Sequence, residues 1–173
     1  MNHRTLSFIA LFIILLLVQV LICNHIILFG VAVPFVFIFF ILRMPIDMGT
    51  PLLLTLSFLL GLGVDICSDT AGMNALACTI LAMVKRKVFF SYVLKDDKSV
   101  SQIPSVASMG VGTYLRYATT MAAIYCLSIF AIEYFSFSDI KEIVIHAAAS
   151  TVLTTLLLLA IDSLLSSRRE KRL

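Results

Sequence analysis

Long apolar runs recur along the whole chain and are separated by short polar stretches. Of its 173 residues, 61% are hydrophobic and 13% are charged, whereas soluble domains are roughly 45–50% apolar. So few charges cannot cover the surface of a soluble domain of this size. Because a membrane-spanning helix needs about 20 mostly apolar residues, we expect residues 1–173 to form a single all-α integral membrane domain, which leaves little chain for an aqueous catalytic domain.

Six of the runs are predicted to cross the membrane as a compact bundle of transmembrane helices. The predicted spans are 6–22, 26–42, 51–66, 71–84, 114–133 and 143–161. The first run begins like a signal peptide but lacks a small-residue cleavage site, so it is kept as a helix. Pro34 interrupts the second run, where neighbouring helices would have to satisfy the freed carbonyl. Residues 85–105 are expected to form a cytoplasmic loop and residues 166–173 a basic cytoplasmic tail.

The basic residues are distributed asymmetrically about these spans. Twelve of the 13 Lys and Arg residues fall on the side that holds both termini, and only Lys141 falls on the other. Because basic residues mark cytoplasmic loops, both termini are predicted to be cytoplasmic. The basic surface also predicts contact with anionic lipids and does not imply nucleic-acid binding. The residues expected to anchor helices at the membrane interfaces are Lys85, Arg86, Lys87, Tyr114, Arg116, Tyr117, Tyr134, Arg168 and Arg169.

Few polar side chains lie within the apolar runs. Gln19, Asn74 and His146 are expected to form hydrogen bonds between helices, and a proton relay is the functional alternative for His146. The four cysteines show no Cys-x-x-Cys spacing, so they are interpreted as small buried apolar residues and no cofactor is expected. Cys23 and Cys67 fall on the same predicted side and could pair if that side is oxidising.

The end of the third run and the reversal after it concentrate unusual residues. Ser57, Gly61 and Asp65 recur every four residues, so they share a helix face and are predicted to form a close-packed seam. Gly72, at the start of the fourth run, is assigned to the same packing or partner seam. At the outer end of this face, Asp65 could accept hydrogen bonds from the next helix or contact a partner. Asp69 or Thr70 is expected to cap the start of that next helix.

An enzymatic alternative uses some of the same residues. Part of the motif with which CDP-alcohol phosphotransferases hold two metal ions is matched by Asp47, Gly61, Asp65 and Asp69. The motif's early Gly, Ala and Arg positions hold Met48, Pro51 and Leu52. The phosphate-binding part is therefore missing, and a continuous helix would place Asp47 and Asp65 at opposite membrane faces. We therefore expect neither an enzyme nor a metal site.

The third and fourth runs together resemble the rod-shape-determining MreD family of bacteria. The resemblance rests on Gly61, Asp65, Gly72 and the stretch MNALACTILAM that follows them. It implies a non-enzymatic scaffold of the cell-elongation machinery in the bacterial cytoplasmic (inner) membrane, which supports rod shape and lateral peptidoglycan synthesis. It also implies association with the bitopic membrane protein MreC and, through it, with peptidoglycan synthases and MreB.

The layout is also similar to that of the substrate-binding subunits of energy-coupling-factor vitamin transporters. A small-molecule-binding membrane subunit is therefore the alternative function. Such a subunit needs a pocket with a few well-placed polar groups. The chain has no Trp and its predicted outward loops are short, which favours the scaffold.

Overall fold

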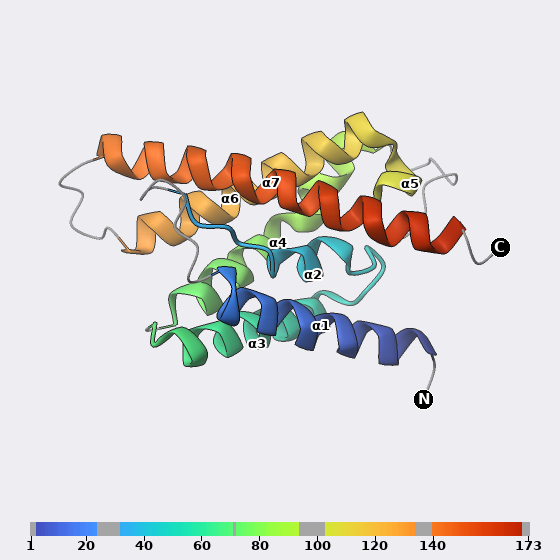
Figure 1. The fold of residues 1–173 in the computed structure, drawn as a ribbon, viewed down its shortest axis with the longest axis horizontal. Helices are drawn as coiled ribbons and strands as arrows, with labels where there is room; N and C mark the ends of the chain where they lie inside the picture. The colour runs from blue at the N-terminus through green and yellow to red at the C-terminus, as the bar shows by residue number, and fades with distance from the viewer. Residues whose placement is uncertain (1–2, 24–31, 71, 94–102, 134–139, 171–173) are drawn as a thin grey trace.

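A computed structural model describes the chain except for residues 1–2, 24–31, 71, 94–102, 134–139 and 171–173. The described residues form seven α-helices (Figure 1). The helices are α1 (His3–Leu21), α2 (Ile38–Arg43), α3 (Thr50–Ser68), α4 (Met73–Tyr92), α5 (Val106–Met109), α6 (Val111–Glu133) and α7 (Ile140–Glu170).

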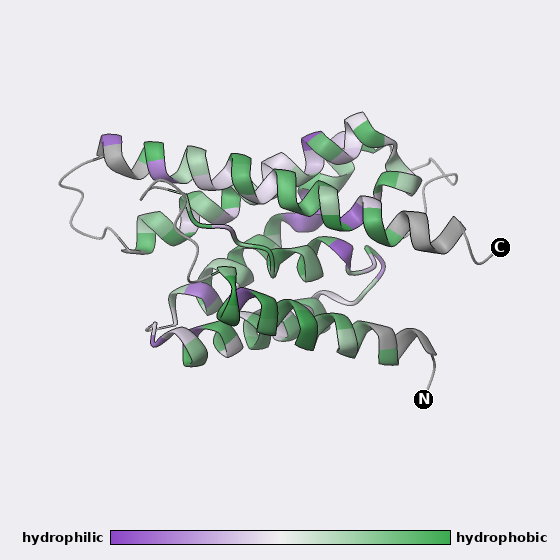
Figure 2. Cartoon of the chain, viewed as in Figure 1, coloured by the Kyte–Doolittle hydropathy of each residue, from purple (hydrophilic) through white to green (hydrophobic). Residues whose placement is uncertain are grey.

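Three stretches of described helix are long and apolar enough to cross a membrane. They are Thr50–Ser68, Val111–Ile132 and Val144–Leu165, and a shorter apolar helix covers Phe8–Leu21. Large apolar side chains such as Ile66, 75% exposed, lie on the outer faces of these helices. Figure 2 shows hydrophobic residues along most of α1, α3 and α7. An all-helical protein with an apolar outer surface is suited to a bilayer.

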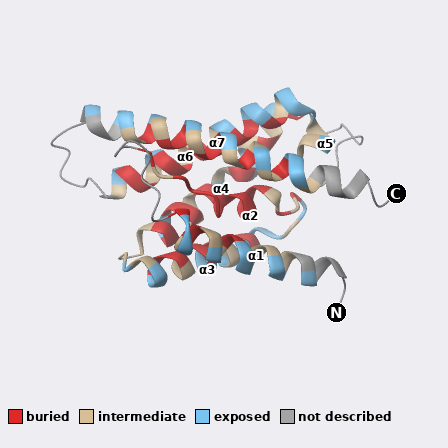
Figure 3. Cartoon of the chain, in the orientation of Figure 1, coloured by how far each residue is buried: buried red, intermediate tan, exposed pale blue. Residues whose placement is uncertain are grey.

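The helices pack around a centre that holds α2 and residues 32–37, which precede it. α3 packs on α4, α4 on α6 and α6 on α7, while α1 covers α3 (Figure 1). Residues 37–42 are almost completely buried, and Figure 3 shows burial concentrated in α2, α4 and the inner faces of the outer helices. Tyr125 of α6 packs edge-on against Phe35 and Phe37, with ring centroids 5.0 and 5.6 Å apart.

The second predicted span, 26–42, is not a continuous helix in its described part. Residues 33–35 are extended, residues 36–37 form a turn, and only Ile38–Arg43 are helical. Pro34 accounts for this difference, because it has no N–H to donate and it disfavours the helical conformation at Val33. The prediction of a helix over the whole run was therefore wrong.

Side chains from α1 and α7 satisfy the backbone of this extended segment. The bonds run from Val33 N–H to Ser150 Oγ (3.1 Å), Phe35 N–H to Thr154 Oγ1 (3.1 Å), Val36 N–H to Gln19 Oε1 (2.9 Å) and Gln19 Nε2 to Pro34 O (3.1 Å). Non-helical backbone is tolerated at membrane depth only when protein or water satisfies it. Gln19 thus binds residues 33–37, which we call the interior segment.

Two helices run further than the apolar runs predict. α4 continues to Tyr92, so residues 85–92 of the predicted loop 85–105 are helical. Lys and Arg are good helix formers, so three basic residues in a row do not end a helix. α7 continues to Glu170, into the predicted tail 166–173.

Candidate functional site

Asp65, near the end of α3, lies against the start of α4 and is 2% exposed. Its Oδ1 accepts hydrogen bonds from Thr70 Oγ1 (2.5 Å), the Asn74 N–H (3.1 Å) and Asn74 Nδ2 (2.9 Å), and its Oδ2 accepts from the Ala75 N–H (2.8 Å). The first-turn amides of a helix carry partial positive charge and lack partners within the helix. Asp65 therefore caps the helix that follows its own.

The hydrogen-bond network continues into a third helix. Tyr125 of α6 donates from its hydroxyl to Asn74 Oδ1 at 2.5 Å, and both side chains are buried. The interhelical hydrogen bonding predicted for Asn74 is confirmed. Asp65, Asn74 and Tyr125 together connect α3, α4 and α6, and we call these three residues the closure network.

Gly61 lets α3 approach the backbone of α4. A Cβ atom at this position would lie 2.5 Å from Asn74 O and 2.6 Å from Ala75 Cα, far inside ordinary contact. Ser57 and Gly61 are buried, as is Asp65 on the same helix. The hydroxyl of Ser57 has no hydrogen-bond partner within the described part of the chain.

The neighbouring residues act differently from what the sequence predicts. Asp69 ends α3 in the left-handed conformation, with φ of 54°. Thr70 donates to Asp65, so Asp65 caps α4, whereas Asp69 and Thr70 do not. Gly72, expected in the seam, is the N-cap at φ +79° with open space around its Cβ position, so it supplies a backbone conformation that glycine adopts readily.

The partner contact considered for Asp65 does not fit this geometry. The carboxylate is buried and already receives four hydrogen bonds. The carboxylate can stabilise the reversal between the two helices. Its oxygens are poorly accessible to a metal ion or to a side chain of a partner protein. The prediction in which Asp65 serves the next helix is the one that the structure follows.

A second buried polar cluster joins α2, α5 and α7. Arg43 Nη1 lies 2.7 Å from Asp162 Oδ1, and the Val106 N–H donates to Asp162 Oδ2 at 2.7 Å. Asp162 is fully buried, and the Arg43 guanidinium also lies over the Phe39 ring, 5.6 Å from its centroid. The sequence alone does not predict the pairing of Asp162 with Arg43. The missed signal is an acid and an Arg at the ends of two apolar runs on one predicted side.

Three predicted interface anchors are core residues instead. Lys85 is 1% exposed and donates from Nζ to Met44 O at 2.5 Å, and its burial lowers the pKa of the amine to about 7. Tyr114 and Tyr117 are also buried, and Tyr117 packs edge-on against Phe89. Tyr114 and Tyr117 lie on helix faces turned toward other helices, and the buried Lys85 amine is held by the Met44 carbonyl.

The other predicted anchors divide into two groups. Arg86, Lys87 and Arg116 are exposed. Tyr134 and the side chains of Arg168 and Arg169 lie outside the described residues.

The cysteines, His146 and the acidic residues of the enzymatic alternative are placed as follows. Cys23 is buried and Cys67 exposed, and both are free thiols. The ring of His146 lies beside that of Phe130, with the two ring centroids 6.0 Å apart. Asp47 is exposed ahead of α3, whereas Asp65 lies near the end of that helix. Within the described ranges, no three His, Cys, Asp or Glu side chains are grouped to hold a metal ion.

The closure network has the character of a structural connection between helices. Its carboxylate, amide and phenol satisfy one another inside an apolar bundle, where unpaired polar groups are costly. Comparison of the chain with models of protein families, with curated proteins and with solved structures finds no significant match.

Proposed function

We propose that this chain is a non-enzymatic scaffold of the bacterial cell-elongation machinery in the cytoplasmic membrane. In this proposal it supports rod shape and lateral peptidoglycan synthesis by associating with an MreC-like bitopic protein and, through it, with peptidoglycan synthases and MreB. The observation that carries the proposal is the buried closure network, in which Asp65 receives four hydrogen bonds from within the chain.

Asp65 and Asn74, two of the residues behind the resemblance to the MreD family, belong to this network. Gly61 brings the α3 backbone against α4, and Asp65 then reaches the first-turn amides of α4. A helix pair closed in this way presents fixed outer faces. Fixed apolar faces are what a membrane scaffold offers to a partner helix.

The same geometry weighs against the phosphotransferase. From Thr50 to Asp65, α3 rises about 22 Å, so Asp47 and Asp65 lie near opposite ends of one helix. A two-metal site requires its ligands around ions about 3.5–4 Å apart. These two carboxylates are therefore poorly placed to share such a site.

Six spans with both termini in the cytoplasm are part of the proposal. The start of α1 and the end of α7 lie at the same end of the bundle (Figure 1), as an even number of crossings requires. Extended chain advances about 3.3 Å per residue, against 1.5 Å in a helix. With residues 33–35 fully extended and residues 36–43 rising about 1.5 Å each, residues 33–43 can cover up to roughly 22 Å although α2 is short.

The transport-subunit alternative is less well supported. The interior segment, which would be the natural place for a ligand site, already bonds its N–H groups at Val33, Phe35 and Val36 to side chains of α1 and α7. A ligand would have to displace these bonds, which favours the scaffold.

The proposal is tested by isolating the tagged chain from its native membrane in mild detergent and identifying what co-purifies. We expect a bitopic MreC-like protein to be retained, and the exposed-site variant Asp69→Asn to retain it equally. Recovery of a transporter ATPase pair in place of elongation proteins would overturn the scaffold and favour the alternative.

A further inference from the structure

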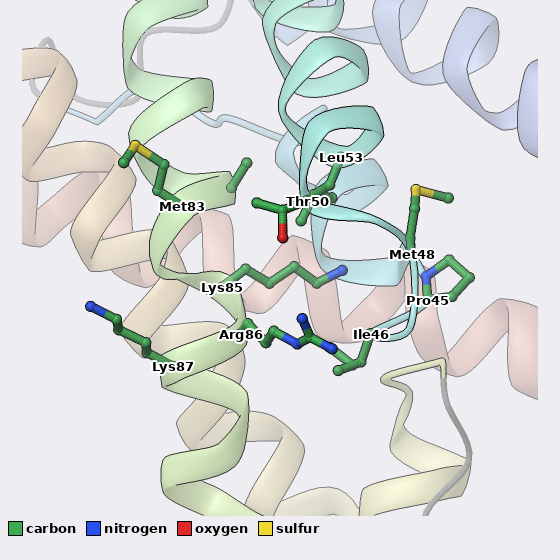
Figure 4. Close-up of a pocket in the computed structure, with 10 residues that line it drawn as sticks. Pro45, Ile46, Met48, Thr50, Leu53, Met83, Lys85, Arg86 and Lys87 are labelled. Atoms are coloured by element: carbon green, nitrogen blue, oxygen red, sulfur yellow. The ribbon is translucent and has the colours of Figure 1, made fainter.

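A pocket of about 190 Å³ opens where α3 begins, beside the basic part of α4. Its lining includes Thr50, Leu53, Met83, Lys85, Arg86 and Lys87. Figure 4 shows Lys85 and Arg86 extending from α4 toward the turn that carries Pro45, Ile46 and Met48, whereas Lys87 points to the other side. Arg86 is thus the exposed cation on one wall of the pocket, beside the buried amine of Lys85.

The charge of this pocket is one-sided. Three lining residues are basic and none is acidic, and the acid of the adjoining turn, Asp47, is exposed and lies outside the lining. The hydrogen bond to Met44 O holds Lys85 in the wall. The 19-residue helix α3 also begins here, with no side-chain cap at Gly49 and no acid in its first turn. Basic side chains and helical amides together favour an anion.

The remaining lining is apolar and continues onto the outer surface of the bundle. Leu53 and Ala82 are buried in the pocket wall, and Met83, which also lines it, is 62% exposed. Leu52, which precedes Leu53 in the first turn of α3, is also largely exposed. A cationic end that leads into an apolar helix surface matches a phospholipid, whose phosphate is joined to acyl chains. A free phosphate would gain nothing from the apolar side.

We propose that this pocket binds the phosphate of an anionic glycerophospholipid, with Arg86 on the phosphate and an acyl chain against Met83. This site is separate from the closure network and does not depend on the scaffold function. It requires only that the start of α3 lie at the level of the lipid headgroups.

The test measures lipid binding to the full-length purified protein by native mass spectrometry in mild detergent. The probes are phosphatidylglycerol, phosphatidylcholine and inorganic phosphate. We expect one phosphatidylglycerol to be retained at least fivefold more strongly than phosphatidylcholine, with no competition from inorganic phosphate. Equal retention of the two lipids would overturn the proposal. Competition by inorganic phosphate would show a simple anion site and would also overturn it.

Matched variants separate the pocket from the general positive charge of the protein. Arg86→Gln should weaken phosphatidylglycerol retention about fivefold, since a basic residue near anionic lipid contributes about 1 kcal/mol. Arg116→Gln, an exposed position on α6 with the same change in charge, should have less than a twofold effect. Equal effects of the two variants would show diffuse attraction and contradict a site.

A third variant fills the pocket with negative charge while favouring the fold. Thr50→Glu places a carboxylate in the lining and in the first turn of α3, where an acidic side chain stabilises a helix. The unfolding temperature should be unchanged or higher, and phosphatidylglycerol retention should fall to the level of phosphatidylcholine. Retention at the wild-type level by this variant would refute the site even if Arg86→Gln failed to fold.

Discussion

Replacing Gly61 with alanine adds a single methyl group at the contact between α3 and α4. The added Cβ would lie 2.5 Å from Asn74 O and 2.6 Å from Ala75 Cα, whereas ordinary contacts begin at 3.4 Å. Both neighbours are backbone atoms, so neither can move by rotating a side chain. The helices must therefore separate by about 1 Å.

The cost follows from this separation. Overpacking a fitted contact costs about 1–3 kcal/mol. A shift of about 1 Å would also stretch the 2.8 Å bond from the Ala75 N–H to Asp65 beyond hydrogen-bond distance. Alanine recovers up to about 1 kcal/mol through its higher helix propensity. We expect a net loss of about 2 kcal/mol, or about 4–8 °C in unfolding temperature for a chain of this length.

Gly63→Ala is the matched control, two residues along the same helix. A Cβ at Gly63 would meet Leu16 Cδ1 at 2.6 Å, and this atom ends a half-buried, flexible side chain of α1. We expect an unfolding temperature equal to that of the wild type or slightly higher, measured in the same detergent. If the two alanine variants unfolded at the same temperature, the close contact at Gly61 would be refuted.

Three further predictions concern the buried polar groups. Tyr125→Phe removes the donor to Asn74 Oδ1 and should lower the free energy of unfolding by about 1 kcal/mol; no change on chemical denaturation would contradict that bond. Asp65→Asn replaces one acceptor oxygen by a donor and should strongly reduce accumulation of the protein in the membrane. Asp69→Asn should accumulate normally, because Asp69 is exposed and asparagine tolerates a left-handed backbone. Asp162→Ala should increase proteolysis near Val106, because the α5 amide loses its acceptor; protease resistance equal to that of the wild type would refute the connection.

The apolar runs predict most of the long helices because their limits are set by hydrophobicity. The predicted spans 51–66 and 114–133 lie within three residues of α3 and α6 at each end. The spacing of Ser57, Gly61 and Asp65 also predicts a shared face, since helical periodicity is a local property.

The interior segment could not be predicted in the same way. A short apolar run has the same composition whether it is helical or extended. The non-helical backbone around Pro34 depends on hydrogen bonds from distant residues. Gln19 lies 15 residues away, and Ser150 and Thr154 lie more than 100 residues away. Aromatic and basic residues near helix ends are similarly ambiguous, because Tyr117 can serve a lipid interface or a core, and only the packing partner decides.

In the proposed function, the chain supports rod shape as a structural member of the elongation machinery. The most direct test of this proposal is cell width and length after depletion of the chain in the organism that encodes it. We predict that depleted cells become wide and round, and that wild-type chain and Asp69→Asn restore rods. Depleted cells that remain rods of normal width would contradict the account, and loss of one phospholipid class in those cells would favour the phosphotransferase.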